Sequence, residues 1–192
     1  MGLTPEQMGE AIIANLSKKT GKTLQEWIET VKSAGPENQK DRIEWLKREY
    51  NLGSVTAETV VFEAEKPEDY VAPALEDFVN AQYSGPKAVL RPIYDLVIQK
   101  AQKLGPDVKV SPCKTYMALM RRRQVAIVKA STLTRVDIGL ALPGVETTTR
   151  LQAAARALGG SDRITHRVAL TSTDDIDAEL LIWLKAAYDA DG

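Results

Sequence analysis

Three consecutive arginines, Arg121, Arg122 and Arg123, stand between two segments whose apolar residues alternate. Met120 precedes them and Gln124 follows, so they should form the tip of a β-hairpin. Because successive side chains of a strand point to opposite faces, the three cannot all be buried, and most should face solvent. Guanidinium groups match phosphate geometry, so such a turn could bind an anion, with nucleic acid the leading ligand. The alternative is a solvated turn that aids solubility and protects a strand edge.

Further basic residues would extend this surface if they share its face. They are Lys114, Lys129, Arg135, Arg150, Arg156, Arg163 and Arg167. Nucleic-acid contact through such residues would go mainly to phosphates and carry little sequence specificity.

A second group of polar residues could line a pocket for a small anion. Arg135 and Asp137 are two residues apart in a predicted strand and therefore share a face. Lys114 and Tyr116 should lie near them. His166 is the only histidine, and a structural or solvent-facing role is favoured over a general base because no positioned partner is visible. The competing interpretation of Arg135 and Asp137 is a structural salt bridge across the sheet.

The sequence offers little support for an enzyme. A single cysteine, Cys113, excludes an intrachain disulfide, and no Cys-x-x-Cys, His-x-x-x-His or Gly-x-x-x-x-Gly-Lys motif is present. We therefore expect no metal and no cofactor, although chemistry based on carboxylates or lysine stays open. The start, "MGLTPEQMGEAII", lacks the features of a signal peptide, and no apolar run approaches the roughly 20 residues of a membrane span. We expect a soluble cytoplasmic protein.

Charge is distributed unevenly along the 192 residues, although the net charge is only −1. Residues 1–83 carry 9 basic and 15 acidic side chains, residues 84–171 carry 15 and 5, and residues 172–192 carry 1 and 6. A basic middle between acidic flanks suggests either an anionic partner or attraction between the protein's own surfaces.

The pattern of apolar residues predicts two domains. Residues 1–66 read as a small bundle of four helices, with starts at Thr4-Pro5 and at the capping box Thr23-x-x-Glu26, and with breaks at Gly35-Pro36 and "NLGS". The two helices around "NLGS" could form a helix-turn-helix, but their acidity argues against DNA binding. Residues 67–84 read as a linker and a short helix.

Residues 85–192 predict an α+β domain in which two helices pack against one face of a mostly antiparallel sheet. The first helix should run from about Pro86 to Leu104, and the last should begin with a cap at Thr173 to Asp175. Between them, alternation favours strands at "VKVSP", "KTYMALM", "QVAIVKA", "TRVDIGLAL" and "THRVALTS".

Both halves resemble known families. "SKKTGKTLQEWIETVKSAG" and "EWLKREYNLG" resemble bacterial domain of unknown function 4287, whereas "YSGPKAVLRPIYDLVIQKAQKLGPDVKVSPCKTYMALMRRRQVAIVKASTLTRVDIGL" and "HRVALTSTDDIDAELLIWLKAAYDA" resemble domain of unknown function 5655. The second family is in turn remotely similar to YjbR and YdhG domains, through a basic turn, an alternating strand and Arg-x-Asp-x-Gly-Leu. YjbR domains are similar to a double-wing DNA-binding fold, so this resemblance implies nucleic-acid binding by analogy.

These observations give a ranked set of hypotheses. The first is a non-enzymatic nucleic-acid-binding accessory protein that binds DNA or RNA through the basic middle region, while the acidic bundle contacts a protein partner. The second is a module that binds a small anionic metabolite or a protein. An enzyme is the least favoured.

Overall fold

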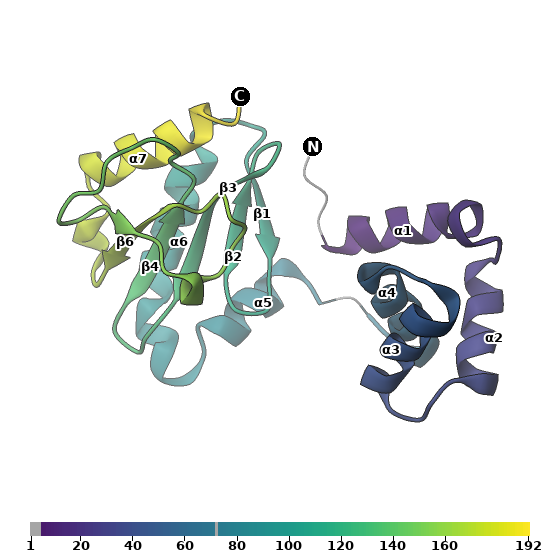
Figure 1. The fold of residues 1–192 in the computed structure, drawn as a ribbon. Coiled ribbons are helices and arrows are strands. Elements are labelled where there is room, and N and C mark those ends of the chain that lie inside the picture. The colour runs from purple at the N-terminus through teal and green to yellow at the C-terminus, as the bar shows by residue number, and fades with distance from the viewer. Residues whose placement is uncertain (1–4, 72) are drawn as a thin grey trace. The chain divides into compact units, whose positions relative to one another are not determined.

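A computed structural model describes residues 5–71 and 73–192, which form two compact units on either side of residue 72 (Figure 1). The predicted cap at Thr4 lies outside the described residues. Each unit has its own hydrophobic core. The α+β class predicted from the sequence, a helical bundle followed by an antiparallel sheet with helices, is confirmed.

The first unit contains four helices whose ends follow local sequence signals. They are α1 (Pro5–Thr20), α2 (Leu24–Ala34), α3 (Gln39–Tyr50) and α4 (Ser54–Glu65). The capping box predicted for α2 is present: the Glu26 backbone N–H donates to Thr23, and the Glu26 carboxylate accepts from the Thr23 backbone N–H at 2.7 Å. The α3 helix ends at Asn51, whose φ of 53° is the left-handed conformation that asparagine tolerates.

The core of this unit is built from one side of each helix. Leu16 comes from α1, Trp27 and Val31 from α2, Leu46 from α3, and Ala57, Val60, Val61 and Ala64 from α4, with Leu52 in the α3–α4 turn. Burial of these residues removes apolar surface from water and holds four short helices together, since helices of this length are marginal in isolation.

The second unit is organised around a six-stranded antiparallel sheet. Its strands are β1 (Lys109–Pro112), β2 (Met117–Met120), β3 (Gln124–Ala130), β4 (Val136–Leu140), β5 (Gln152–Ala153) and β6 (His166–Leu170), in the order β1-β2-β3-β4-β6-β5. The first four strands form the predicted meander. The sequence did not predict β5, which is only two residues long and pairs with β6 at the sheet edge.

Helices cover one face of the sheet. They are α5 (Leu75–Gln82), the 3-10 helix η1 (Gly85–Leu90), α6 (Arg91–Gln102), η3 (Thr173–Asp175) and α7 (Ala178–Asp189). The alternating residues Val136, Ile138 and Leu140 of β4 point into this layer and are fully buried together with Val97 and Leu184 from the helices. The short α5, which the sequence assigned to the linker region, packs on this side as part of the sheet unit.

The opposite face is covered by the chain between β4 and β6, which includes η2 (Arg156–Leu158). Leu158 and Ile164 of this segment pack on Ile127 of β3 and form a small second core. Gly139 of β4 permits this close approach, because a Cβ there would lie 2.7 Å from Ile164 and 2.8 Å from Ile127. The sheet is therefore buried on both sides in its middle.

Two predicted helix boundaries differ from the observed ones. The helix expected from Pro86 onward is split into η1 and α6 at Arg91, because Pro92 has no backbone N–H to continue the helix and its ring would clash with the preceding turn. The last helix is capped by Asp177, which accepts from the Leu180 backbone N–H at 3.0 Å, whereas Thr173 to Asp175 form a separate 3-10 turn. Across residues 5–71 and 73–192, every helix is too short or too polar to cross a lipid bilayer.

Candidate functional site

The arginine triplet forms the turn between β2 and β3, as the alternation predicted, and this turn encloses a buried carboxylate. The backbone N–H groups of Arg122 and Arg123 both donate to Oδ2 of Asp191, at 3.0 and 2.7 Å. The Asp191 side chain is completely buried. Two adjacent backbone donors that converge on one carboxylate fix the conformation of the turn.

Two guanidinium groups complete the surroundings of this carboxylate. Arg123 Nε lies 2.7 Å from Asp191 Oδ1, and Arg163 Nη2 lies 3.1 Å from the same oxygen. Burial by itself would raise the pKa of Asp191, but the backbone and side-chain hydrogen bonds from Arg123, with the charge of Arg163, hold that pKa below its ordinary value. Asp191 is therefore charged at neutral pH.

Arg121 turns to the other side of the hairpin and is held there. Its Nε lies 2.8 Å from Asp107, its Nη1 donates to the Tyr188 carbonyl at 3.1 Å, and its guanidinium stacks 4.1 Å from the centre of the Tyr188 ring. Hydrogen bonds from Arg121 and from the Tyr188 hydroxyl keep the pKa of Asp107 below its usual range. These contacts attach the turn to the end of α7.

The three arginines therefore have different roles. Arg121 is mostly covered, whereas the side chain of Arg123 is 60% exposed although it contacts Asp191. Arg122 is exposed, and its guanidinium makes no hydrogen bond or ion pair with another described residue. Arg122 and Arg123 are thus the members of the triplet that are accessible to a ligand.

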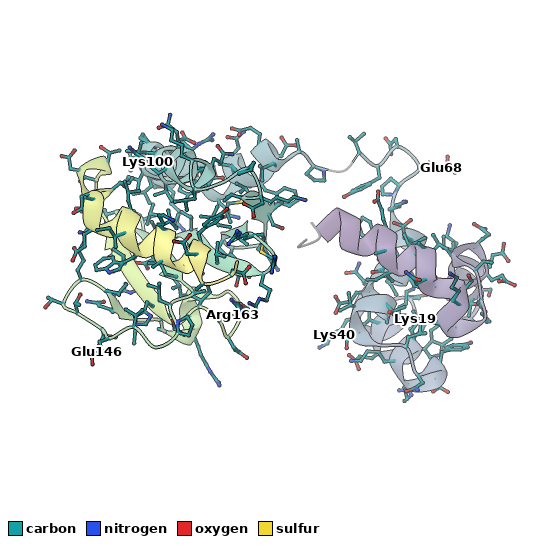
Figure 2. The ribbon with its side chains drawn as sticks, turned by 90° about the horizontal axis from the view of Figure 1, so that it is seen from above. Lys19, Lys40, Glu68, Lys100, Glu146 and Arg163 are labelled. Carbon is teal, nitrogen blue, oxygen red and sulfur yellow. The ribbon has the colours of Figure 1, made fainter. Side chains whose placement is uncertain are left out.

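Figure 2 shows Arg163 and Lys100 on opposite sides of this unit.

A second charged cluster lies on the face of the sheet opposite the helices. Asp137 of β4 is almost fully buried, and its Oδ1 lies 3.1 Å from Arg135 Nε and 3.0 Å from Arg167 Nη1. Arg135 shares this face because it is two residues from Asp137, and Arg167 pairs with the neighbouring Gly139. The Arg135–Asp137 ion pair considered in the sequence analysis is present.

The other polar groups of this face also have partners. Lys129 lies opposite Asp137 in the β3–β4 pair, but its ammonium donates to the carbonyls of Ala157 and Leu158 at 2.7 and 3.1 Å. Arg167 also donates to the side chain of Gln152. This cluster thus attaches the covering segment to the sheet. Most of its hydrogen-bond donors are already used within the protein, so few are free for a ligand.

The remaining predicted pocket residues are not brought together. Lys114 is exposed in the β1–β2 turn. Tyr116 packs beside Gly159, where a Cβ would lie 3.0 Å from the ring. His166 is buried, with its Nδ1 2.9 Å from the Thr165 hydroxyl, and it falls in alternation with Val168 on the helix-covered face, whereas Asp137 belongs to the opposite face.

Sequence reasoning missed Asp191 as a member of the site. The one available signal was charge: the acidic segment 172–192 complements the basic middle region. The same complementarity recurs at Arg150, whose Nη1 lies 2.7 Å from Asp177 and 2.8 Å from Glu179. Within the described parts of the chain, no three His, Cys, Asp or Glu side chains gather where they could hold a metal ion.

One known family has a model that covers almost all of the second unit. The model of a domain of unknown function, DUF5655, covers residues 79–191. The chain belongs to this family. The DUF5655 domain thus contains the whole sheet, the arginine turn and Asp191. A second model, the domain of unknown function DUF4287, matches residues 9–66 in the helical unit. No curated protein and no solved structure gives a significant match.

Proposed function

We propose that the DUF5655 domain is a non-enzymatic module that binds nucleic acid through its phosphates, with Arg122 and Arg123 as the main contacts. The observation that carries this proposal is the exposed pair of guanidinium groups on a turn whose backbone is already fixed by buried Asp191. A ligand that binds a preformed turn does not have to order it, so more of the contact free energy is available for binding.

The distribution of charge supports the same proposal. The acidic C-terminal segment neutralises part of the basic region, through Asp191 and through the pairs of Arg150 with Asp177 and Glu179. It leaves Arg122 unpaired among the described residues, and one carboxylate, Asp191, serves both Arg123 and Arg163. Contacts of this kind recognise phosphate rather than base sequence.

The positions of the most reactive side chains favour a binding role over catalysis. His166 is buried and bonded to Thr165, and three strands separate β6 from β1, which ends next to Cys113. A nucleophile and base must lie within hydrogen-bond reach, and this sheet order keeps the two residues apart.

The test is a binding titration of labelled duplex and single-stranded DNA and RNA at several salt concentrations. Arg122→Ala should reduce the slope of log K against log salt by about 0.9 for each lost duplex phosphate contact. Lys100→Ala removes the same charge on α6, which lies on the helical side of the sheet, and should leave the slope unchanged. Absence of binding by the wild type at low salt, or an equal effect of both substitutions, would exclude the arginine turn as a phosphate site.

One observation favours a second candidate, a site for a small anionic metabolite or an acidic protein segment. Arg135 and Arg167 flank Asp137 on the sheet face, and Arg135 Nε is buried without a hydrogen bond of good geometry. A carboxylate or phosphate group of a ligand could accept hydrogen bonds from the guanidinium groups of Arg135 and Arg167. Stabilisation of the wild type but not of Arg135→Ala, in a thermal-shift screen of phosphates, nucleotides and carboxylates, would assign the ligand to this face.

A protein partner for the acidic helical unit belongs to the same proposal. Residues 1–72 carry 13 acidic and 9 basic side chains, an excess of four acidic ones, so a basic protein surface would complement this unit. Retention of this partner by a fragment that lacks residues 1–72 would assign the contact to the sheet unit instead.

A further inference from the structure

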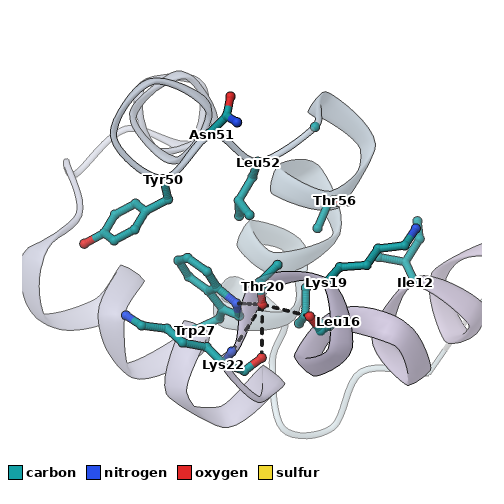
Figure 3. A pocket seen from close by; sticks show the side chains of 11 residues that line it. Ile12, Leu16, Lys19, Thr20, Lys22, Trp27, Tyr50, Asn51, Leu52 and Thr56 are labelled. Atoms are coloured by element: carbon teal, nitrogen blue, oxygen red, sulfur yellow. Dashed lines mark hydrogen bonds between the residues drawn. The ribbon is translucent and has the colours of Figure 1, made fainter.

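The helical unit contains a pocket that is independent of the arginine turn. Its volume is about 550 Å³, within the usual range for sites that bind small molecules. The lining residues come from α1, the α1–α2 turn, α2, the end of α3, the α3–α4 turn and the start of α4 (Figure 3): Ile12, Leu16, Lys19, Thr20, Lys22, Trp27, Tyr50, Asn51, Leu52, Gly53 and Thr56. Two lysines and no acidic residue belong to this lining.

One end of the pocket is aromatic. The rings of Trp27 and Tyr50 meet edge to face with their centres 5.1 Å apart. The Lys22 ammonium lies 4.8 Å from the Trp27 ring centre and 5.3 Å from that of Tyr50, and it donates to the Thr30 hydroxyl at 3.2 Å. Lys22 is thus held in place by cation–π contacts and a hydrogen bond. The two rings make this end of the pocket apolar, and the Lys22 ammonium gives it a positive charge.

The polar groups in the middle of the pocket are already satisfied. The Trp27 indole N–H donates to the Thr20 hydroxyl at 2.9 Å, and that hydroxyl donates to the Leu16 carbonyl at 2.8 Å. Leu16 and Leu52 lie beside them in the floor of the pocket and are themselves buried. The polar groups in this part are therefore not free for a ligand, and the apolar surface open to it belongs mainly to Tyr50 and Ile12.

The other end offers donors without partners. Figure 3 shows Lys19, Thr56 and Ile12 together on the side away from Lys22 and Tyr50. Lys19 is exposed, and its ammonium pairs with no other described residue. Thr56 lies in the first turn of α4, which begins after Gly53 without a side-chain cap, so the backbone donors of this turn add to the positive potential.

We infer that this pocket binds a small organic anion with a planar apolar body and a carboxylate or phosphate at one end. The body lies across the floor formed by the buried Trp27 and Leu52, between the more exposed Tyr50 and Ile12 (Figure 3), and the anionic group is bound by the Lys19 ammonium and the Thr56 hydroxyl. The absence of acidic residues from the lining gives the charge complementarity that selects an anion over a cation. This inference concerns the DUF4287 region and does not depend on nucleic-acid binding by the sheet unit.

The experiment is isothermal titration of the full chain with 2-naphthoate, with neutral 2-naphthalenemethanol and with inorganic phosphate. We expect saturable binding of 2-naphthoate, about tenfold weaker binding of the alcohol because a charge-assisted hydrogen bond is lost, and no saturation by phosphate. Lys19→Ala should weaken 2-naphthoate binding to a similar extent, and Thr56→Val should weaken it less. Lys18→Ala is the matched control, since Lys18 is exposed and does not line the pocket.

Several outcomes would overturn the inference. No saturation by 2-naphthoate at millimolar concentration would show that the pocket does not accept this class of ligand. Equal binding of the alcohol would remove the anionic requirement, and equal binding of phosphate would remove the apolar one. An equal loss in Lys18→Ala and Lys19→Ala would assign the effect to general charge. Circular dichroism of the variants separates these outcomes from misfolding, since both lysines lie exposed on α1.

Discussion

The carboxylate of Asp191 accepts hydrogen bonds from both the backbone N–H and the guanidinium of Arg123, each at 2.7 Å. These two residues lie 68 positions apart in the sequence. The contact joins the β2–β3 turn to the chain that follows α7, and it brings a basic segment and an acidic segment together. The net charge of −1 hides this internal complementarity.

Replacement of Asp191 by alanine should destabilise the protein. The substitution leaves the backbone N–H groups of Arg122 and Arg123 without their acceptor, which costs about 1–3 kcal/mol when such groups stay buried. Urea unfolding measures the loss. Asp189→Ala is the control, because Asp189 pairs with Lys185 on the exposed surface of α7, where such pairs contribute about 0–1 kcal/mol. Equal losses in the two variants would contradict the structural role of Asp191.

Stability should fall in acid partly because of Asp191. Burial opposes its ionisation, but contacts with Arg123 and Arg163 leave its pKa in the folded state below the unfolded value of about 4. The folded state therefore releases this proton more readily, so the stabilisation is complete above that value and is lost as pH falls through the lower, folded pKa. Urea unfolding at a series of pH values should show a shallower acid decline for Asp191→Asn than for the wild type. Parallel curves would assign the decline to other carboxylates, such as Asp107 and Asp175, whose pKa values are also lowered.

The substitution Gly139→Ala should weaken the packing of the covering segment. The added methyl group would lie 2.7 Å from Ile164 and 2.8 Å from Ile127, so side chains or backbone must shift. Overpacking of this kind costs about 1–3 kcal/mol. A double-mutant cycle with Ile164→Ala should give less than the sum of the single effects, because removal of Ile164 makes room for the methyl group. Strict additivity would show that the two positions do not meet.

Loss of the Asp137 carboxylate should cost more than loss of either arginine beside it. Asp137→Ala leaves Arg135 and Arg167 facing one another without the group that both contact, and a loss of about 1–3 kcal/mol is expected. Arg135→Ala should have a smaller effect, since this side chain is 37% exposed and water can replace part of its interaction. Chemical denaturation compares the variants, and the reverse order of effects would be inconsistent with the pairing described above.

Features that depend on neighbouring residues were predictable from the sequence, and features that depend on distant ones were not. The Thr23–Glu26 capping box and the arginine turn are set within a few residues, so their patterns predicted them. The break at Pro92 also had a local cause and was overlooked. By contrast, the contact between Asp191 and the turn depends on how α7 docks, and composition alone indicated no more than that the two segments attract.

The long separation between Arg123 and Asp191 also bears on the order of assembly. A hairpin such as β2–β3 can form early because its strands are adjacent in the chain. Arg121 can then pair with Asp107, just before β1, but Arg122 and Arg123 still lack the carboxylate of Asp191. The carboxylate that Arg123 contacts arrives when α7 docks and places Asp191 beside the turn. The Asp191 contact is therefore expected to form after the rate-limiting step, so its loss should accelerate unfolding while the refolding rate changes little.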